Sequence, residues 1–466
     1  MFFIRNFYYL VKKKLNKKIV GIFVLTLLIT NVIPAIGITI EITNKSENNV
    51  STDGWLEEID GVKILHLSGS YYEMGYQHGS LLKDDIQQNL RAYLAFLELA
   101  GVTYDDLLDL WDIMKDYVPQ DYKDELQGLA DGSDLTFEDG AAAIMMEVLN
   151  HDITACFHAA AWDSATIDGN LYHFKSNDWS LIIKDPDTGI YLQENQVIIV
   201  RIPDDGYASV YPAFAGTIVG NSGINDQGVC LTTSVSWCMN DISNHGIPFS
   251  LRGRMTLDKA STSDEAIEIL NNNRTRGWNF IISDVNQNCY VLEQSATNSY
   301  IGTYDNLEES NHPFWEIENV VRRGNCFIEK NMASLQRKIY EPRSFLHWFF
   351  YSKITKLFGF YDSFKYEYFP EFMHYKVLSD EIENHLGNLD LNVSMSILRD
   401  CYSGKTNFKW NFFQNILGWY RSVTWQWAIC PETGDMVISF ADANKSAHIN
   451  TVHYFNFNNL VNSTPP

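Results

Sequence analysis

The sequence changes character at Cys156, and that change restricts the folds open to the chain. Before this residue the pattern is mainly helical, and five apolar residues fall on one face of an amphipathic helix: Ile86, Leu90, Tyr93, Leu94 and Leu97. After it come short β-rich runs, among them residues 196–202 and 228–235, and two strands within 424–440 joined by a turn. Interleaved strands and helices behind a helical lead-in predict stacked layers of α and β structure.

Residues that favour helix ends divide the lead-in. Gly101 can end the first helix, and Thr103 and Thr136 are suitable N-caps for a second and a third. Farther along the chain, residues 258–270 are predicted to form a helix with Ser261 or Ser263 as its cap.

The N-terminus has the pattern of a targeting signal. Residues 1–37 hold basic residues up to Lys18 and no acidic residue, and residues 19–37 are almost entirely apolar. We expect a signal peptide or, because the apolar run is long enough to span a bilayer, a membrane anchor. The protein is then secreted or held at the outer face of the cell membrane, with the lysines left in the cytoplasm. Residues 38–55 are polar and are expected to be a linker.

The charge balance excludes one class of partner. The chain carries 58 acidic and 35 basic residues, a formal net charge of -23. A surface this negative repels the phosphates of nucleic acid. Nucleic-acid binding is therefore not expected, and contact with a membrane is expected only through residues 19–37.

The cysteine and histidine spacings predict no metal site. None of the seven cysteines forms a paired CxxC motif, and no HExxH, GxSxG or Walker sequence is present. We expect no cofactor. In an exported protein an odd number of cysteines leaves at least one free thiol, and we expect Cys156 to stay reduced while some of the others pair.

The segment after Cys156 predicts a hairpin. Asp168-Gly169 is a strong turn signal between two short β-prone runs. The hairpin would bring residues 175–179 back beside Cys156, so that a thiol, a cation, an amide and a carboxylate share one end of a sheet. Taken alone, this pattern also fits a buried structural cysteine next to a tight turn.

Several motifs occur in one order along most of residues 60–440. They are Tyr71–Leu82 (YYEMGYQHGSLL), Cys156, Ala160–Trp162, Ser164–Thr166, Asp168-Gly169, Asn177–Trp179, Gly223–Gly228, Asn311–Pro313 and the hairpin at 424–440. In this order they resemble the acyl-coenzyme A:6-aminopenicillanic acid acyltransferase family. Its members are N-terminal nucleophile (Ntn) hydrolases related to the choloylglycine hydrolases.

The resemblance implies an α+β fold, the four-layer αββα Ntn-hydrolase sandwich, and a zymogen that cuts itself between Ala155 and Cys156. The new α-amine, with a pKa of about 7.7–8.0, would then accept the proton of the Cys156 thiol. The implied parts are a helical, propeptide-like segment at 56–155, a catalytic domain at 156–455 with an insertion at about 331–400, and a tail at 456–466. The N-terminal fragment is expected to stay bound after the cut.

Three further catalytic roles are implied position by position. Asp178 matches the aspartate that binds the cysteine amine, with a solvated turn carboxylate as the alternative. Asn311 matches the asparagine that supplies an oxyanion donor, with a helix or turn cap as the alternative. Lys175 stands where the choloylglycine relatives have arginine, and lysine keeps the charge without the bidentate fork.

The remaining matches are less specific. Ser234 stands where relatives usually have a second asparagine, and there the backbone N–H can still serve as an oxyanion donor. Arg322 belongs to a basic pair that would contact the oxyanion or the substrate, with a solvated helix face as the alternative. His78 is expected to hold the lead-in to the sheet, and His312 is expected to be structural.

These matches predict an exported, autoproteolytic hydrolase or acyltransferase. It would cleave a linear amide C–N bond of a small N-acyl substrate through an acyl-enzyme. Three alternatives stay open: an acyltransferase with an amine acceptor, a ceramidase-like lipid amidase with residues 345–372 as an apolar lid, and a non-catalytic cell-surface binding module.

Overall fold

The computed structural model describes residues 53–149, 155–236, 238, 240–311, 313–336, 372–402, 421–443 and 445–465. The predicted signal peptide or anchor at 1–37 and the linker as far as residue 52 lie outside these ranges. So do His312 and residues 345–371 of the predicted lid. In the ranges described, every helix is too short or too polar to cross a membrane.

Nine strands form the first sheet, which we call sheet A. Its strand order is β1-β2-β5-β6-β7-β8-β9-β10-β11, and only the β2–β5 pairing is parallel. The bounds are β1 (Trp55–Ile59), β2 (Val62–Gly69), β5 (Gln196–Pro203), β6 (Ser209–Phe214), β7 (Ser222–Asn225), β8 (Cys230–Val235), β9 (Trp278–Ser283), β10 (Tyr290–Gln294) and β11 (Ser299–Gly302).

Six antiparallel strands form the second sheet, sheet B. Their order is β12-β3-β4-β13-β14-β15. The bounds are β12 (Val320–Arg323), β3 (Ala155–Asp163), β4 (Gly169–Ser180), β13 (Arg421–Ile429), β14 (Asp435–Phe440) and β15 (His453–Asn456). The β13–β14 hairpin is where the sequence predicted it.

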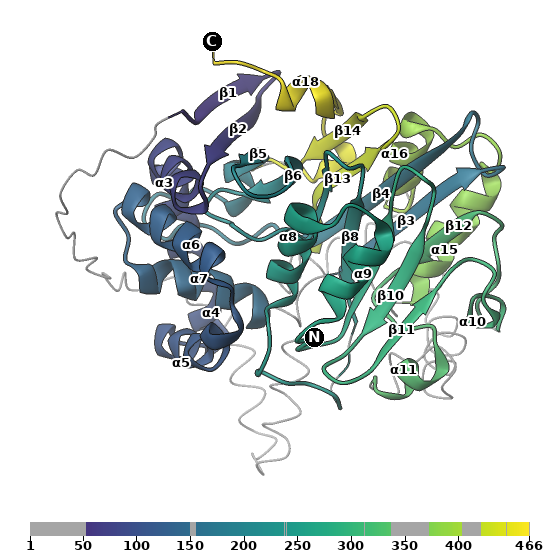
Figure 1. Cartoon of the computed structure of the whole chain (residues 1–466), viewed down its shortest axis with the longest axis horizontal. Coiled ribbons are helices and arrows are strands. Elements are labelled where there is room, and N and C mark those ends of the chain that lie inside the picture. The colour runs from purple at the N-terminus through teal and green to yellow at the C-terminus, as the bar shows by residue number, and fades with distance from the viewer. Residues whose placement is uncertain are drawn as a thin grey trace, which may run out of the picture.

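Helices cover the outer faces of both sheets (Figure 1). On sheet A lie α3 (Tyr71–Leu81), α4 (Lys83–Leu99), α5 (Tyr104–Met114), α6 (Gln120–Ser133), α7 (Phe137–Leu149), α8 (Phe249–Lys259) and α9 (Ser263–Asn271), whose apolar faces share one core with that sheet. On sheet B lie α15 (Phe372–Asn384) and α16 (Leu391–Asp400). The described residues also include the short helices α10 (Leu307–Ser310), α11 (Lys330–Ser334) and α18 (Phe457–Val461).

A third core lies between the two sheets. Ile64 and Ile198 of sheet A pack with Trp425, Trp427 and Ile438 of sheet B. Two sheets face to face with helices outside each of them make the αββα sandwich, so the predicted fold class is confirmed. The helices α15 and α16, which were expected in an insertion, supply the outer layer over sheet B.

The lead-in differs from the prediction in one respect. It was expected to be helical, but it begins with β1 and β2, and β2 pairs with β5 inside sheet A. In β2 the buried residues Val62, Ile64 and His66 lie on one face, and residues on the other face are buried as well. The sequence therefore shows no clear alternation of apolar and polar residues. Strands from the N-terminal segment are therefore part of the main sheet.

The motif at Tyr71–Leu82 has a packing explanation. Its two glycines, Gly75 and Gly79, lie on α3 where that helix crosses α6, and Gly128 lies on α6 at the same crossing. A Cβ atom added at Gly75 would lie 2.0 Å from the carbonyl oxygen of Glu125, and one at Gly128 would lie 2.0 Å from that of Tyr72. Only glycine permits this close approach of the two backbones.

Most predicted helix ends in the lead-in are confirmed. Helix α4 ends just before Gly101, whose φ is +77°, and Thr103 and Thr136 cap the next helices through their hydroxyls. The helical interval predicted at 258–270 contains the end of α8 at Lys259 and most of α9, and the cap of α9 is Thr262 rather than Ser261 or Ser263.

Candidate active site

Cys156 is the second residue of β3, next to the end of β4. The β3–β4 hairpin pairs Cys156 with Asn177 and Ala155 with Asp178. The turn between the strands includes Gly169, whose φ of +80° suits glycine. The predicted hairpin is thus confirmed, and it does bring the 175–179 segment beside the cysteine.

The Cys156 thiol is surrounded by protein. Its side chain is 4% exposed, and Sγ donates a hydrogen bond of 3.6 Å to Oδ1 of Asn177. Burial raises the pKa of the Cys156 thiol, and the positive charge of Lys175 opposes that rise. In this uncut chain the thiol is therefore held mainly in its protonated form at neutral pH.

Lys175 is buried between the sheets. Its Nζ donates a hydrogen bond of 3.3 Å to the carbonyl oxygen of Asn221 and lies 5.0 Å from the centre of the Trp425 ring. The side chain brings one positive charge to the neighbourhood of the thiol, as the sequence predicted.

Asp178 is fully buried on the other side of the β3–β4 ladder. Its Oδ1 accepts a hydrogen bond of 3.0 Å from Ser176, and its Oδ2 accepts one from the hydroxyl of Tyr402. Tyr402 follows α16 and stacks on Phe157 with ring centres 5.5 Å apart. A solvated turn carboxylate, the alternative for Asp178, does not fit this burial.

Tyr402 was missed by sequence reasoning. It lies more than two hundred residues from Asp178 along the chain and belongs to no motif. Only the docking of α16 against sheet B brings the two together.

The structure does not bring Asn311 to Cys156. Asn311 is the exposed C-cap residue of α10, which was its alternative role. Instead, the backbone N–H of Cys156 donates a hydrogen bond of 3.0 Å to Oδ1 of Asn325. Arg323, the last residue of β12, pairs with His158 in antiparallel register, so the chain two residues past the end of β12 places Asn325 opposite Cys156. Asn325 is therefore a second side-chain amide beside the candidate nucleophile, in addition to Asn177.

Ser234 lies close to the candidate site, whereas Arg322 does not. The Ser234 hydroxyl is buried and donates a hydrogen bond of 2.7 Å to the carbonyl oxygen of Gly324, next to Asn325. Arg322 lies under α15, where its guanidinium donates to the carbonyl oxygen of Trp315 at 2.6 Å and sits 4.8 Å from the Tyr375 ring. It is neither a solvated residue nor a contact of Cys156.

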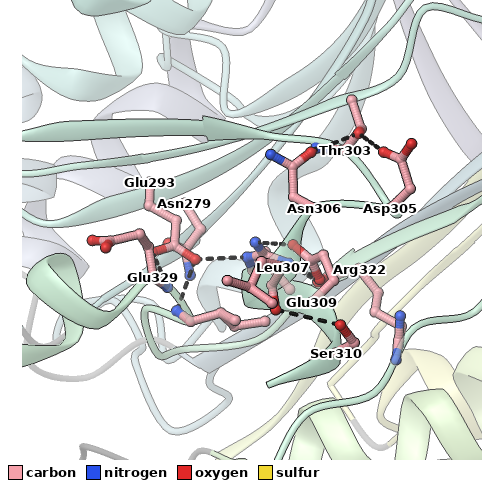
Figure 2. Close-up of polar contacts among 12 residues, drawn as sticks. Asn279, Glu293, Thr303, Asp305, Asn306, Leu307, Glu309, Ser310, Arg322 and Glu329 are labelled. Atoms are coloured by element: carbon pink, nitrogen blue, oxygen red, sulfur yellow. Dashed lines mark hydrogen bonds and ion pairs between the residues drawn. The ribbon is translucent and has the colours of Figure 1, made fainter. Parts of the chain in front are cut away.

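The chain segment around Asn325 is held by buried polar groups, of which Asn279 and Glu293 are labelled in Figure 2. Asn279 Nδ2 donates to the carbonyl oxygens of Gly324 and Cys326 at 2.8 and 3.0 Å. Glu293 accepts from the backbone N–H of Ile328 at 2.7 Å and from Glu329 at 3.1 Å. These bonds hold the backbone in place on both sides of Asn325.

Arg323 links this segment to its surroundings. Its buried guanidinium forms ion pairs of 2.9 Å with Glu293 and 2.6 Å with Glu309 of α10. Burial raises the pKa of Glu293 to about 7, and the charge of Arg323 opposes the rise. The cluster is buried and paired, which explains why α10 is held here and leaves Asn311 at the surface.

Two other expectations concern cysteines and metals. All seven cysteines are buried free thiols, so the disulfide pairing expected among the others is not found. Among the residues with described positions, no group of three or more His, Cys, Asp or Glu side chains is arranged to hold a metal ion.

Comparison with known families supports the motif-based resemblance. Residues 174–355 match the family model described as acyl-coenzyme A:6-aminopenicillanic acid acyl-transferase. The matched range includes Lys175, Asp178 and Asn325. The resemblance to this Ntn-hydrolase family is therefore confirmed.

Curated relatives match part of the chain. Protein dcd1B of Dictyostelium discoideum is 28% identical over 250 residues, covering 47% of this chain and 47% of the relative. An uncharacterized protein of Archaeoglobus fulgidus is 23% identical over 271 residues, covering 50% of this chain and 43% of the relative. The chain thus spans about half the length of these curated relatives.

Solved structures that match the chain include a bile acid hydrolase and an acid amidase. The conjugated bile acid hydrolase of Clostridium perfringens is 16% identical, with 66% of this chain and 94% of that chain covered and a TM-score of 0.38. The Caenorhabditis elegans N-acylethanolamine-hydrolyzing acid amidase ortholog is 12% identical, with 65% and 99% covered and a TM-score of 0.36.

Proposed function

We propose that the chain is an autoproteolytic cysteine hydrolase that cleaves a linear amide bond of a small N-acyl substrate. One observation carries the proposal: Cys156 lies at the start of a strand with Lys175, Asp178 and Asn325 around it. A cysteine at that position becomes both nucleophile and N-terminus once the preceding bond is cut.

The cut uses the thiol that later attacks substrate. Sγ of Cys156 adds to the carbonyl carbon of Ala155, and the C–N bond breaks as the nitrogen takes a proton. The acyl group is then held as a thioester on sulfur. Water hydrolyses this thioester, giving a carboxylate at Ala155 and a free amine at Cys156.

The free amine then serves as the base. An α-amine ordinarily has a pKa of about 7.7–8.0, so it accepts the thiol proton near neutral pH, even though burial disfavours the thiolate. Asp178, in register with Ala155, is the carboxylate beside the new amine and stabilises its protonated form. Lys175 adds a positive charge that favours the thiolate.

Substrate turnover repeats the chemistry on another amide. The thiolate attacks the substrate carbonyl, and the leaving amine departs with the proton held by the Cys156 amine. Water then resolves the acyl-enzyme to a free acid, while an amine acceptor would give acyl transfer instead. Asn325 Oδ1 accepts from the nitrogen of Cys156, and Nδ2 donates to the carbonyl oxygen of Val235 at 2.9 Å. We assign the second hydrogen of Nδ2 to the oxyanion, a contribution of about 100-fold or more in rate.

Denaturing mass spectrometry tests the proposal. The purified parent chain should yield a fragment that begins with Cys156, and Cys156→Ala should remain whole and inactive. Cys156→Ser should cut more slowly, because a hydroxyl is the weaker nucleophile. Cys230→Ala, which changes another buried thiol, is the matched control and should cut like the parent.

Two outcomes would contradict this function. One is a parent chain that is active while intact through Cys156, and the other is a Cys156→Ala chain that still cuts itself at this bond. Once cutting is established, a panel of N-acyl amino acids, bile-salt conjugates, penicillins and ceramides identifies the substrate class. That panel also separates a small-molecule amidase from a lipid amidase.

A further inference from the structure

Two buried histidines between the sheets have no part in the chemistry above. His158 of β3 and His173 of β4 are both 0% exposed, and each bonds to hydroxyls of sheet A. Together with those hydroxyls they form a chain, which we call the relay: Ser283, His173, Thr232, His158 and Ser234.

The relay is continuous from Ser283, at the end of β9, to the carbonyl oxygen of Gly324 beside Asn325. Ser283 Oγ lies 2.7 Å from His173 Nδ1, and His173 Nε2 lies 2.7 Å from Thr232 Oγ1. Thr232 Oγ1 is also 2.7 Å from His158 Nδ1, and His158 Nε2 is 3.1 Å from Ser234 Oγ. Ser234 then donates to the carbonyl oxygen of Gly324 at 2.7 Å.

The final acceptor sets the direction of every bond. A carbonyl oxygen can only accept, so the Ser234 hydroxyl donates its one hydrogen to the Gly324 carbonyl oxygen. Ser234 must therefore accept from His158 Nε2–H. A neutral imidazole carries one N–H, so His158 Nδ1 accepts from Thr232. By the same reasoning Thr232 accepts from His173 Nε2–H, and His173 Nδ1 accepts from Ser283.

The two rings are held neutral, as this reasoning requires. Burial lowers the pKa of His173 to about 3 and that of His158 well below its usual range, and the charge of Lys175 lowers both further. Each histidine therefore has one donor and one acceptor nitrogen, and all five hydrogens point toward Gly324.

The end of the relay is next to the amide that contacts the nucleophile. The Gly324 carbonyl belongs to the peptide that joins Gly324 to Asn325, and Asn325 Oδ1 accepts from the N–H of Cys156. We propose that the relay positions Asn325 for catalysis, with Thr232 and Ser234 as positioning residues that act through the Gly324 carbonyl. The catalytic part of this inference rests on the function proposed above.

The ring tautomers give a test that needs no activity. The uncut Cys156→Ala chain, with 15N-labelled histidine and asparagine, should show His158 and His173 as neutral Nε2–H tautomers at pH 7. Thr232→Val keeps the shape but removes the central hydroxyl, so it should change the His158 tautomer signal and shift the side-chain amide resonances of Asn325. An Nδ1–H tautomer in either ring, or unmoved Asn325 resonances in Thr232→Val, would overturn the relay.

Kinetics then test its catalytic role in the chain with Cys156 intact. Thr232→Val should lower kcat about tenfold, the cost of roughly one lost hydrogen bond, with KM changed less than about twofold. Thr232→Ser keeps the hydroxyl and should restore most of kcat. Equal kcat in the valine and serine variants would refute the positioning role.

Failures of the two proposals look different. A parent chain that neither cuts itself nor hydrolyses any amide, but shows the expected tautomers and the Asn325 shift, refutes the proposed function and supports the relay as an Asn325-positioning device. A parent chain that cuts itself and hydrolyses amides, with unmoved Asn325 resonances in Thr232→Val, supports the proposed function and refutes the relay as an Asn325-positioning device.

Discussion

Lowering the pH should destabilise this fold, because three buried histidines are neutral in the folded chain and take up protons when it unfolds. His78, His158 and His173 are each at most 1% exposed, and burial is the largest cause of their lowered pKa values. The pKa is lowered to about 3 in His78 and His173. His78 also accepts a hydrogen bond of 3.0 Å from the backbone N–H of Gly216, which requires its neutral Nε2, and it holds α3 to sheet A as the sequence predicted.

The direction in which stability changes with pH follows from the difference between the folded and unfolded pKa values of each ring. In the unfolded chain a histidine titrates near 6.5, whereas in the folded chain the rings of His78 and His173 stay neutral to about pH 3, and burial lowers the pKa of His158 in the same direction. Between those values the unfolded state binds the extra proton, so unfolding becomes easier as the pH falls. The stability from the neutral rings is complete above pH 6.5 and is lost as the pH drops toward 3.

The magnitude is large for a natural protein. One proton taken up on unfolding changes the free energy of unfolding by about 1.4 kcal/mol per pH unit. At pH 5, about 1.5 units below the unfolded value, His78 and His173 each cost roughly 2 kcal/mol, so together they cost roughly 4 kcal/mol. Whole domains are stable by only about 5–15 kcal/mol.

Urea unfolding of the uncut Cys156→Ala chain at pH 7, 6 and 5 measures this loss. His78→Gln keeps an acceptor for Gly216 and cannot be protonated, so it should reduce the loss between pH 7 and 5 by about 2 kcal/mol. His245 is exposed and is the matched control, because His245→Gln should leave the pH dependence unchanged. If His78→Gln keeps the pH dependence of the Cys156→Ala chain, then His78 is not neutral in the fold and the reasoning fails.

Two further predictions concern the active site and the lead-in. Tyr402→Phe should slow self-cutting and turnover about tenfold to a hundredfold, because a hydrogen bond to a carboxylate is worth about 1.5–3 kcal/mol. Timed mass spectrometry measures the rate, and an unchanged rate would mean that Tyr402 only packs against Phe157. The two fragments should elute together in size-exclusion chromatography after the cut, whereas Glu125→Gln should release the N-terminal fragment at a lower urea concentration. That variant breaks the buried ion pair of Glu125 with Arg201, a loss of about 3–5 kcal/mol, and separation of the parent fragments in native buffer would contradict the prediction.

The parts of the site that the sequence predicted depend on local structure. Only residues 164–168 separate β3 from β4, so the chain turns back at once and Lys175 and Asp178 lie close to Cys156 along β4. A two-residue turn centred on Asp168-Gly169 would have paired Cys156 with Leu181, and the longer loop shifts that partner to Asn177. The same reasoning found the helix caps at Thr103 and Thr136.

The parts that it missed depend on long-range pairing. Asn311 has the motif, but the ladder between β3 and β12 is what places an amide beside Cys156, and no local pattern reveals that ladder. Asn325 could have been found by extending a proposed β12 register past Arg323. Tyr402 offered no such route, because its contact with Asp178 depends on how α16 packs across sheet B.

The strands β1 and β2 change how the proposed cut should be understood. Helix α7 belongs to the layer outside sheet A, and β3 belongs to sheet B, so the chain passes from one layer to another between Leu149 and Ala155. The lead-in does not depend on that link for its place. It is held by the pairing of β2 with β5 and by Glu125, whose carboxylate contacts the fully buried Arg201 of β5. A cut before Cys156 would therefore free an amine at the site while leaving sheet A, including the strands that carry Thr232 and Ser234, intact.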